Sequence, residues 1–286
     1  MTIKHILLPL TGEATSADAA VCGMALAKHL GAHVTVGYED ELGPFNMTPD
    51  FGVSPVSYGL FYEQMQKVRQ ERKSQARTYF DRAVGATKLP IVSAPVCQQA
   101  STMWIDDAGG NDAPISSFGA LTDLVVLNSP GNTSNPTGWN IVEAALFGAH
   151  RPTLLVPPRT KTIDVSRALI AWNGSDEAAN AVEHALDLLR PDAKITVLQI
   201  GELKIGRMSA EKLMDYLGWH CFDAELRRLP DRPNETCQII LDEARRATAG
   251  VLIMGAYTHS RTREMMFGGV TDFMMRNAPL PVLMAH

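Results

Sequence analysis

The feature of this sequence that most constrains its fold is an internal repeat with a long period. The segment HILLPLTGEATSADAA begins at His5, and the segment ALIAWNGSDEAANAV begins at Ala168. Aligning Gly12 with Gly174 gives an offset of 162 residues (174 − 12), which matches strand to strand and alanine-rich helix to alanine-rich helix. The ends of the halves also correspond, because RPTLLVPP at 151–158 matches LPVLMAH at 280–286. A single long period predicts two tandem domains, 1–158 and 159–286, rather than a solenoid.

Within each half, strand patterns alternate with helical patterns. In the second half we expect strands at 168–172, 194–200, 221–227 and 251–254, with helices at 209–217 and 235–247. In the first half we expect strands at 6–9, 33–38, 91–96 and 123–127, with helices at 16–30 and near 58–84. This alternation predicts right-handed crossovers and a parallel sheet covered on both faces. Ligands of such sheets bind at the carboxyl ends of the strands, where the strand order reverses.

Composition excludes several classes of function. The 286 residues are 45% hydrophobic and 20% charged, which is typical of a soluble globular protein. The net charge of −5 carries no electrostatic footprint for nucleic acid. The apolar runs are strand-sized, so we expect no membrane span, and the N-terminus runs directly into a strand pattern without a signal peptide. Four cysteines without a CxxC pair indicate reduced thiols in a cytoplasmic protein.

The last stretch of the chain, from Val251 to His286, carries the strongest chemical signal. A buried strand at 251–254 ends at Gly255, a polar and basic loop follows, and the pair Gly268 and Gly269 opens a helix. Such a layout presents bare backbone N–H groups at the positive end of a helix dipole, where phosphate binds. Glycine is favoured there because a Cβ atom would keep the anion away from the backbone.

The same stretch resembles the C-terminal signature of the universal stress proteins. Their nucleotide loop runs Gly, two residues, Gly, nine residues, Gly, then Ser or Thr, and here Gly255, Thr258, Gly268 and Gly269 stand at those positions. Thr258 therefore replaces a glycine, and Gly269 replaces Ser or Thr. The resemblance implies a tandem two-domain member of the family. Each domain would be a Rossmann-like α/β unit of the adenine nucleotide alpha hydrolase-like kind, with a parallel five-stranded sheet flanked by helices and the first and fourth strands adjacent.

The resemblance also implies a site in the second half for an adenine nucleotide: ATP, or ADP or AMP, with or without Mg²⁺. It assigns the ribose and base to the end of the first strand, the packing on adenine to Ile200, and the ribose and phosphates to the loop. Asn173 replaces the usual Asp and keeps a ribose hydrogen bond without the charge. Arg261 and Arg263 would neutralise phosphate charge. The implied binding residues are Ala171, Trp172, Asn173, Ile200, Gly255, Thr258, His259, Ser260, Arg261, Gly268, Gly269, Val270 and Thr271.

The first half lacks this equipment. Asn128 stands in the place of Gly255, and Thr11 stands in the place of Asn173. Nothing in Trp139–Val142 resembles the glycine pair and the residues after it. We therefore expect a first half that is degenerate for nucleotide and retained for structure.

Three classes of function compete for this chain. The first is a stress-response sensor or regulator that binds an adenine nucleotide and acts through a regulatory protein partner. The second is an enzyme of the same α/β group, such as an adenylyltransferase or ATP pyrophosphatase. The chain has neither His-x-Gly-His nor Ser-Gly-Gly-x-Asp-Ser. We therefore assign no catalytic or metal-ligating residue and expect at most a weak ATPase. The third is an interaction module without nucleotide, which the Thr258 and Gly269 departures keep open.

Assembly can also be anticipated. The resemblance implies pairing through the terminal strands, and a tandem chain can make that pairing internally, Thr153–Pro157 against Val282–Ala285. We further expect a homodimer formed through the loop Glu39–Ser57 and the helix after it, where Phe45, Phe51 and Tyr58 would suit a contact surface.

Overall fold

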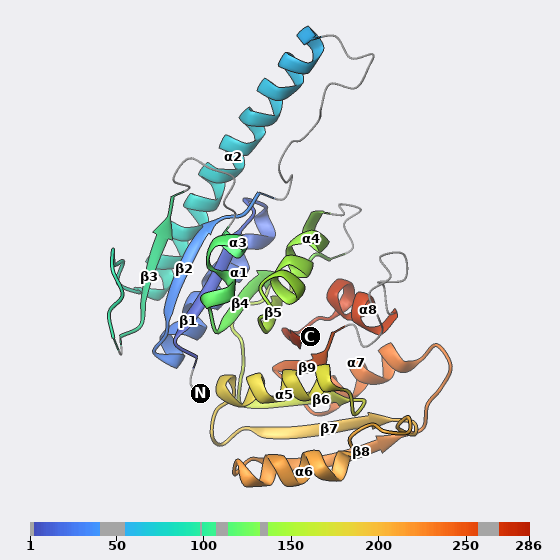
Figure 1. Ribbon diagram of the computed structural model, residues 1–286. Coiled ribbons are helices and arrows are strands. Elements are labelled where there is room, and N and C mark those ends of the chain that lie inside the picture. The colour runs from blue at the N-terminus through green and yellow to red at the C-terminus, as the bar shows by residue number, and fades with distance from the viewer. Residues whose placement is uncertain (1–2, 41–54, 98, 107–113, 132–136, 257–268) are drawn as a thin grey trace.

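The protein is described by a computed structural model covering residues 3–40, 55–97, 99–106, 114–131, 137–256 and 269–286, with side chains omitted at 55–58, 116 and 137–139. Its strands form a single ten-stranded sheet in the order β3-β2-β1-β4-β5-β10-β9-β6-β7-β8 (Figure 1). Every neighbouring pair is parallel except β5 and β10, which are antiparallel. The sheet is therefore continuous across both halves of the chain.

The first half supplies the strands β1 (His5–Leu10), β2 (His33–Tyr38), β3 (Ser101–Ile105), β4 (Leu124–Asn128) and β5 (Thr153–Val156). Its helices are α1 (Ala14–Leu30), α2 (Pro55–Thr87), α3 (Pro114–Phe118), the 3-10 turn η1 (Gly119–Leu121), α4 (Thr137–Glu143) and the π-helical turn η2 (Ala144–Gly148).

The second half supplies the strands β6 (Arg167–Trp172), β7 (Lys194–Ile200), β8 (Asp223–Leu229), β9 (Val251–Gly255) and β10 (Val282–Ala285). Its helices are α5 (Asp176–Leu188), α6 (Ala210–Trp219), α7 (Thr236–Arg246) and α8 (Gly269–Asn277). Each half has its strands in the order 3-2-1-4-5, so the first and fourth strands are adjacent in both. The predicted fold class is confirmed.

The repeat seen in the sequence is also a repeat of backbone conformation. Gly12 and Gly174 each follow the first strand of their half, with φ of 77° and 71°. An added Cβ would lie 2.3 Å from the Arg72 carbonyl oxygen at Gly12 and 2.5 Å from the Met208 carbonyl oxygen at Gly174. A left-handed conformation and a close backbone neighbour both demand glycine, which explains why these two residues anchor the alignment.

One predicted strand is wrong. The segment 91–96 makes only an isolated bridge, Ile91 with Thr102, and the third strand is instead β3, ten residues further along the chain. Ile91 and Val96 are largely exposed despite their apolar side chains. Pro90 and Pro95 lack the N–H that a ladder needs, whereas every residue of Ser101–Ile105 carries one and pairs with β2.

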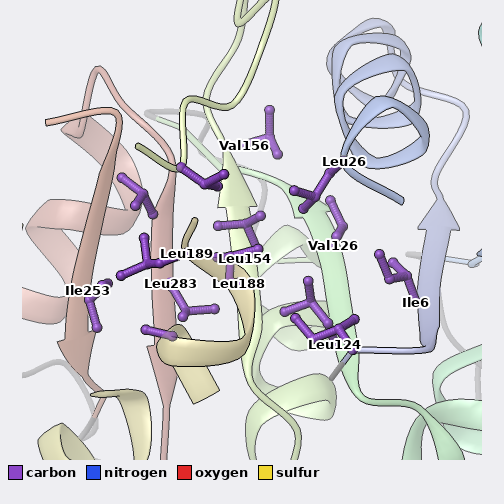
Figure 2. Packing of buried hydrophobic residues seen from close by; sticks show 14 of the residues in the cluster. Ile6, Leu26, Leu124, Val126, Leu154, Val156, Leu188, Leu189, Ile253 and Leu283 are labelled. Atoms are coloured by element: carbon purple, nitrogen blue, oxygen red, sulfur yellow. The ribbon is translucent and has the colours of Figure 1, made fainter. Parts of the chain in front are cut away.

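Apolar side chains fill two layers, one on each face of the sheet. The helices α1, α2, α5 and α6 cover one face, and α3, α4, α7 and α8 cover the other. In the first layer, Leu154 and Val156 of the first half and Leu188, Ile253 and Leu283 of the second belong to one cluster (Figure 2). Since Leu283 of β10 pairs with Leu154 of β5, the expected internal pairing of the terminal strands is confirmed.

The outer strand β8 carries a charged network rather than an apolar edge. The Arg227 guanidinium donates to both oxygens of Glu243 at 3.2 Å, and Arg246 donates to Glu243 at 2.7 Å and to Glu225 at 3.0 Å. Burial alone would raise the pKa of Glu243, but the hydrogen bonds from the two arginines lower it on balance. The hydrogen bond from Arg246 lowers the pKa of Glu225. Charges at a sheet edge discourage pairing with another chain.

The described residues contain neither a candidate membrane span nor a candidate metal site. None of the helices they form has the length and hydropathy to cross a membrane. Nor do they contain a group of three or more His, Cys, Asp or Glu side chains that could hold a metal ion.

Candidate functional site

In the second half, the carboxyl ends of the parallel strands β6 and β9 lie side by side, and we call this point the crevice position. Ala171 of β6 pairs with Met254 of β9, and β7 and β10 lie on the outer sides of these two strands. The strand order therefore reverses between β6 and β9, which is where an open α/β sheet binds its ligands. The chain leaves β6 at Trp172 and β9 at Gly255, so the residues just after both strands meet at this point.

Asn173 is exposed at this point and shapes the turn into α5. Its side-chain oxygen accepts a hydrogen bond of 3.1 Å from the Ser175 N–H, and the Ser175 hydroxyl in turn accepts 3.1 Å from the Ala178 N–H as the helix N-cap. The Asn173 oxygen is therefore already engaged by the backbone. The oxygen keeps a second lone pair, and the side-chain NH₂ group adds a donor where the usual family Asp is only an acceptor.

Trp172 contributes to the core rather than to the crevice. Its side chain is buried in the layer beneath α5 and α6, and its indole Nε1 donates to the Met208 carbonyl at 3.2 Å. Any ligand contact at this position must therefore come from the Trp172 backbone.

Ala171 and Ile200 lie together on the opposite face of the sheet. Both are half-buried and pack against the second apolar layer, and Ile200 ends β7 opposite Leu229 of β8. Ala171 pairs with Leu198, two residues before Ile200, so the two side chains share one face at the carboxyl ends of neighbouring strands. This arrangement offers a partly exposed apolar surface of the kind that a purine ring can pack against.

The two glycines at the ends of the proposed loop differ in what surrounds them. An added Cβ at Gly255 would lie 2.6 Å from the Ala178 backbone nitrogen and 2.8 Å from the Glu177 carbonyl carbon. Gly255 is therefore required by the packing of β9 against the first turn of α5, a reason that the sequence did not reveal. At Gly269, which begins α8, an added Cβ would meet no heavy atom of the described residues within 4 Å.

The first turn of α8 contains the remaining described residues of the predicted site. Val270 is half-buried and Thr271 is buried. Asp272 also lies in this turn, where its carboxylate pairs with Arg276 at 3.1 Å. A negative charge at a helix N-terminus is stabilised by the helix dipole, and it competes with phosphate for that position.

Part of the predicted site lies outside the described residues, namely Thr258, His259, Ser260, Arg261 and Gly268, together with Arg263. The described members come from three strand ends and the start of α8, and they are Ala171, Trp172, Asn173, Ile200, Gly255, Gly269, Val270 and Thr271.

Sequence reasoning missed Glu177 in the first turn of α5. Its carboxylate oxygen Oε2 is buried and accepts no hydrogen bond from any described residue. Its backbone adjoins Gly255, as the added-Cβ distance shows. A buried carboxylate oxygen without a donor is costly, so this atom marks a position where a ligand donor would be favoured. An acidic residue in the first turn of a helix is too common a pattern to have singled it out.

The equivalent crevice in the first half is filled by its own side chains. Asn128, in the place of Gly255, accepts 3.2 Å from the Ser16 hydroxyl and donates 3.2 Å to the Thr15 hydroxyl. Ser16 also lies 2.9 Å from the Thr11 hydroxyl, and both Ser16 and Thr11 are buried. These side chains satisfy one another at the position where, in the second half, Gly255 packs directly against the backbone of α5.

The fold and the crevice define a tandem pair of Rossmann-like α/β domains, and the comparisons with known proteins refine that class. A curated universal stress protein from Synechocystis is 22% identical to this chain, and the match covers 98% of this chain and 99% of that protein. Among solved structures, a universal stress protein from Archaeoglobus fulgidus superposes with a TM-score of 0.62 and 14% identity, covering 99% of this chain and 96% of that chain. No family model matches the sequence.

A functionally unknown protein from Pseudomonas aeruginosa has the same fold, with a TM-score of 0.50, 13% identity and coverage of 99% of this chain and 92% of that chain. The likeness to universal stress proteins therefore extends over both halves. It confirms the resemblance to a tandem two-domain universal stress protein that the sequence had indicated.

Proposed function

We propose that this protein is a stress-response sensor or regulator that binds an adenine nucleotide, ATP or AMP, in its second half. The observation that carries the proposal is the meeting of the β6 and β9 ends, together with an α8 that begins at Gly269, where an added Cβ would meet none of the described heavy atoms within 4 Å. The corresponding position of the first half is filled by Asn128 and its hydroxyl partners. One chain would therefore bind one nucleotide.

The roles of the described residues follow from their placement. Ala171 and Ile200 would pack against the base, and the NH₂ group of Asn173 would donate to a ribose oxygen. The Oε2 atom of Glu177, which accepts from none of the described residues, would accept from a ribose hydroxyl, and this restores a carboxylate to a site whose usual Asp is replaced by Asn173. The N–H groups at the start of α8 would donate to phosphate.

The charge of the site limits its affinity for phosphates. Asp272 lies in the first turn of α8, and its partner Arg276 neutralises it only in part. Arg261 and Arg263 precede this helix in the sequence and would supply the positive charge that a triphosphate needs, with or without Mg²⁺. We propose binding without catalysis, or at most a weak ATPase activity.

Mass spectrometry of nucleotide extracted from the freshly purified protein tests the proposal directly. The expected result is an adenine nucleotide at no more than one mole per mole of chain. Calorimetric titration with ATP and with AMP would then rank the two ligands. Neither co-purified nucleotide nor measurable heat at millimolar ligand would refute the proposal. Two bound nucleotides per chain would refute the filled first-half site.

A second candidate function is an interaction module that binds no nucleotide. Two observations favour it, namely Thr258 in place of the usual glycine and the Asp272 carboxylate at the start of α8. Absence of nucleotide in both experiments, with the fold intact by circular dichroism, would favour this candidate over the first.

Assembly and location complete the proposal. We propose domains at 1–158 and 159–286, a cytoplasmic location supported by four free cysteines, and a homodimer that recruits a regulatory protein partner.

The proposed dimer surface lies around the start of α2. Phe45, Phe51 and the Tyr58 side chain lie outside the described residues. Three exposed apolar residues, Leu60, Phe61 and Tyr62, lie in α2, the helix that extends beyond the rest of the first half (Figure 1). Light scattering at micromolar concentration should give twice 31.1 kDa, and L60E/F61E should halve that mass. A wild-type mass of 31.1 kDa would rule out the homodimer.

A further inference from the structure

The helix that opens the proposed phosphate site is held at its far end by the first half of the chain. The Ser129 hydroxyl, just after β4, donates to the backbone carbonyl of Met275 in α8. Met275 is one of the last four residues of α8, whose carbonyl groups have no partner within the helix. Ser129 therefore satisfies an otherwise orphaned carbonyl, and both residues are buried.

Ser129 is itself fixed by the sheet. Its backbone N–H donates 2.8 Å to the Val156 carbonyl at the end of β5. The hydroxyl thus reaches α8 from a position set by the first half's own strands, which makes the contact a rigid connection between the halves.

The other end of the proposed loop has a similar connection. The carbonyl of Ala256, directly after β9, lies 3.1 Å from Nδ1 of His286. Because a carbonyl oxygen can only accept, Nδ1 carries the proton in this contact. The His286 ring meets the Phe147 ring edge-on at 4.5 Å, and Phe147 belongs to the π-helical turn η2 of the first half. Edge-to-face ring pairs of this kind contribute beyond the area they bury.

The hydrogen bond that Ser129 of the first half makes to the second half has no counterpart at the equivalent residue of the second half, Ala256. Ser129 and Ala256 are equivalent residues, because each follows the fourth strand of its half and each N–H donates 2.8 Å to the end of the fifth strand, at Val156 and at Ala285. Ala256 has no hydroxyl, so the second half cannot return the hydrogen bond that Ser129 makes. The half whose crevice position is filled by side chains therefore supports α8 of the other half.

We propose that Ser129 and Phe147 are positioning residues through which the first half sets the nucleotide affinity of the second. This inference rests on the proposed function. Ser129 holds the end of α8, and Phe147 holds His286 against the residue that begins the loop. The first half thereby has a role although its own crevice is closed.

The test compares S129A with a matched control in the full chain. T122V removes another buried hydroxyl, whose Oγ1 donates 2.8 Å to the Gly119 carbonyl, but its contact lies within the first half. Two readouts are used: amide hydrogen exchange of α8 without ligand, and calorimetric affinity for ATP. A net hydrogen bond corresponds to roughly a two- to tenfold change in an equilibrium constant. We expect S129A to speed exchange in α8 and to weaken ATP binding about two- to tenfold, whereas T122V does neither. F147L should weaken binding without changing exchange at the end of α8.

The outcomes separate this inference from the function on which it rests. Unchanged exchange in α8 of S129A would overturn the inference whether or not nucleotide binds. Faster exchange with wild-type ATP affinity would also overturn it, since the contact would then be structural only. A wild type that binds no ATP, with faster exchange in S129A, would refute the proposed function while leaving the positioning of α8 by Ser129 established.

Discussion

Leu154 of β5 and Leu283 of β10 lie opposite each other in antiparallel register at the centre of the ten-stranded sheet. Both side chains are buried in the same apolar cluster, which contains residues from both halves (Figure 2). This pair belongs to the one antiparallel contact among the described strands. It turns two sheet edges, each open to association, into a buried joint within one molecule.

The joint should make the two halves unfold together. We expect L283A to lower the free energy of unfolding by about 2–5 kcal/mol, because it removes buried methyl groups and leaves a cavity. Calorimetry should show a single transition in the wild type and in the variant. L121A, at an exposed side chain, is the control and should shift stability little. Two separate wild-type transitions would show that the halves are thermodynamically independent.

Replacement by alanine should affect stability at only one of the two glycines that bound the proposed loop. G255A places a Cβ 2.6 Å from the Ala178 nitrogen, so we expect a loss of about 1–3 kcal/mol in stability. G269A meets no neighbour within 4 Å in the described part of the chain, so its stability should stay near that of the wild type. Chemical denaturation measures both variants.

A measurement of ATP affinity can separate a role of Gly269 in binding phosphate from its role in packing. If phosphate approaches the start of α8, G269V should bind ATP more weakly while its melting temperature is retained. A G269V protein with wild-type ATP affinity would exclude a close phosphate approach at this residue.

The four thiols should react at very different rates. Burial, with a smaller contribution from Asp18, raises the pKa of Cys22 to about 11, and its Sγ donates 3.3 Å to the Thr160 carbonyl. Since the thiolate is the reactive form, Cys22 should be inert to a disulfide reagent at pH 8. The exposed Cys97 and Cys221 should react quickly, and the half-buried Cys237 more slowly. Rapid labelling of Cys22 in the native protein, located by peptide mapping, would contradict its buried placement.

The charged network on β8 should make the protein sensitive to acid. The pKa of Glu243 and that of Glu225 are lower in the folded chain than their ordinary value near 4.5. Their contribution to stability is therefore present above that pH and is lost as the pH falls through the folded pKa. We expect E243Q to be less stable than the wild type at pH 7 and to lose less stability between pH 5 and pH 3.

Urea midpoints at several pH values measure this difference. E235Q, which removes an exposed partner of Arg232 at 3.4 Å, is the matched control and should leave the pH dependence almost unchanged because surface ion pairs contribute little. Equal acid sensitivity in E243Q and the wild type would assign the effect to other carboxylates.

The duplicated α/β plan could be predicted from the sequence, because apolar periodicity and turn glycines are local properties of the chain. Gly12 and Gly174 are readable as equivalents since each must adopt a left-handed conformation after a strand. The pairing of the terminal strands 153–157 and 282–285 was predicted from the resemblance to the universal stress proteins and not from a local pattern, and the structure confirms it. The third strand was misplaced because 91–96 has an apolar pattern, and only pairing with β2 selects Ser101–Ile105.

The roles of the individual site residues depend on tertiary packing and could not be predicted from the sequence. Trp172 follows the strand pattern toward the crevice, yet its indole is buried against Met208, and Gly255 is required by α5 at least as much as by any ligand. The packing of the Glu177 backbone against Gly255, the side chains at the first-half crevice position and the Ser129 contact all join residues far apart in the chain. Such contacts depend on how strands and helices pack, and packing brings together side chains whose proximity no local pattern records.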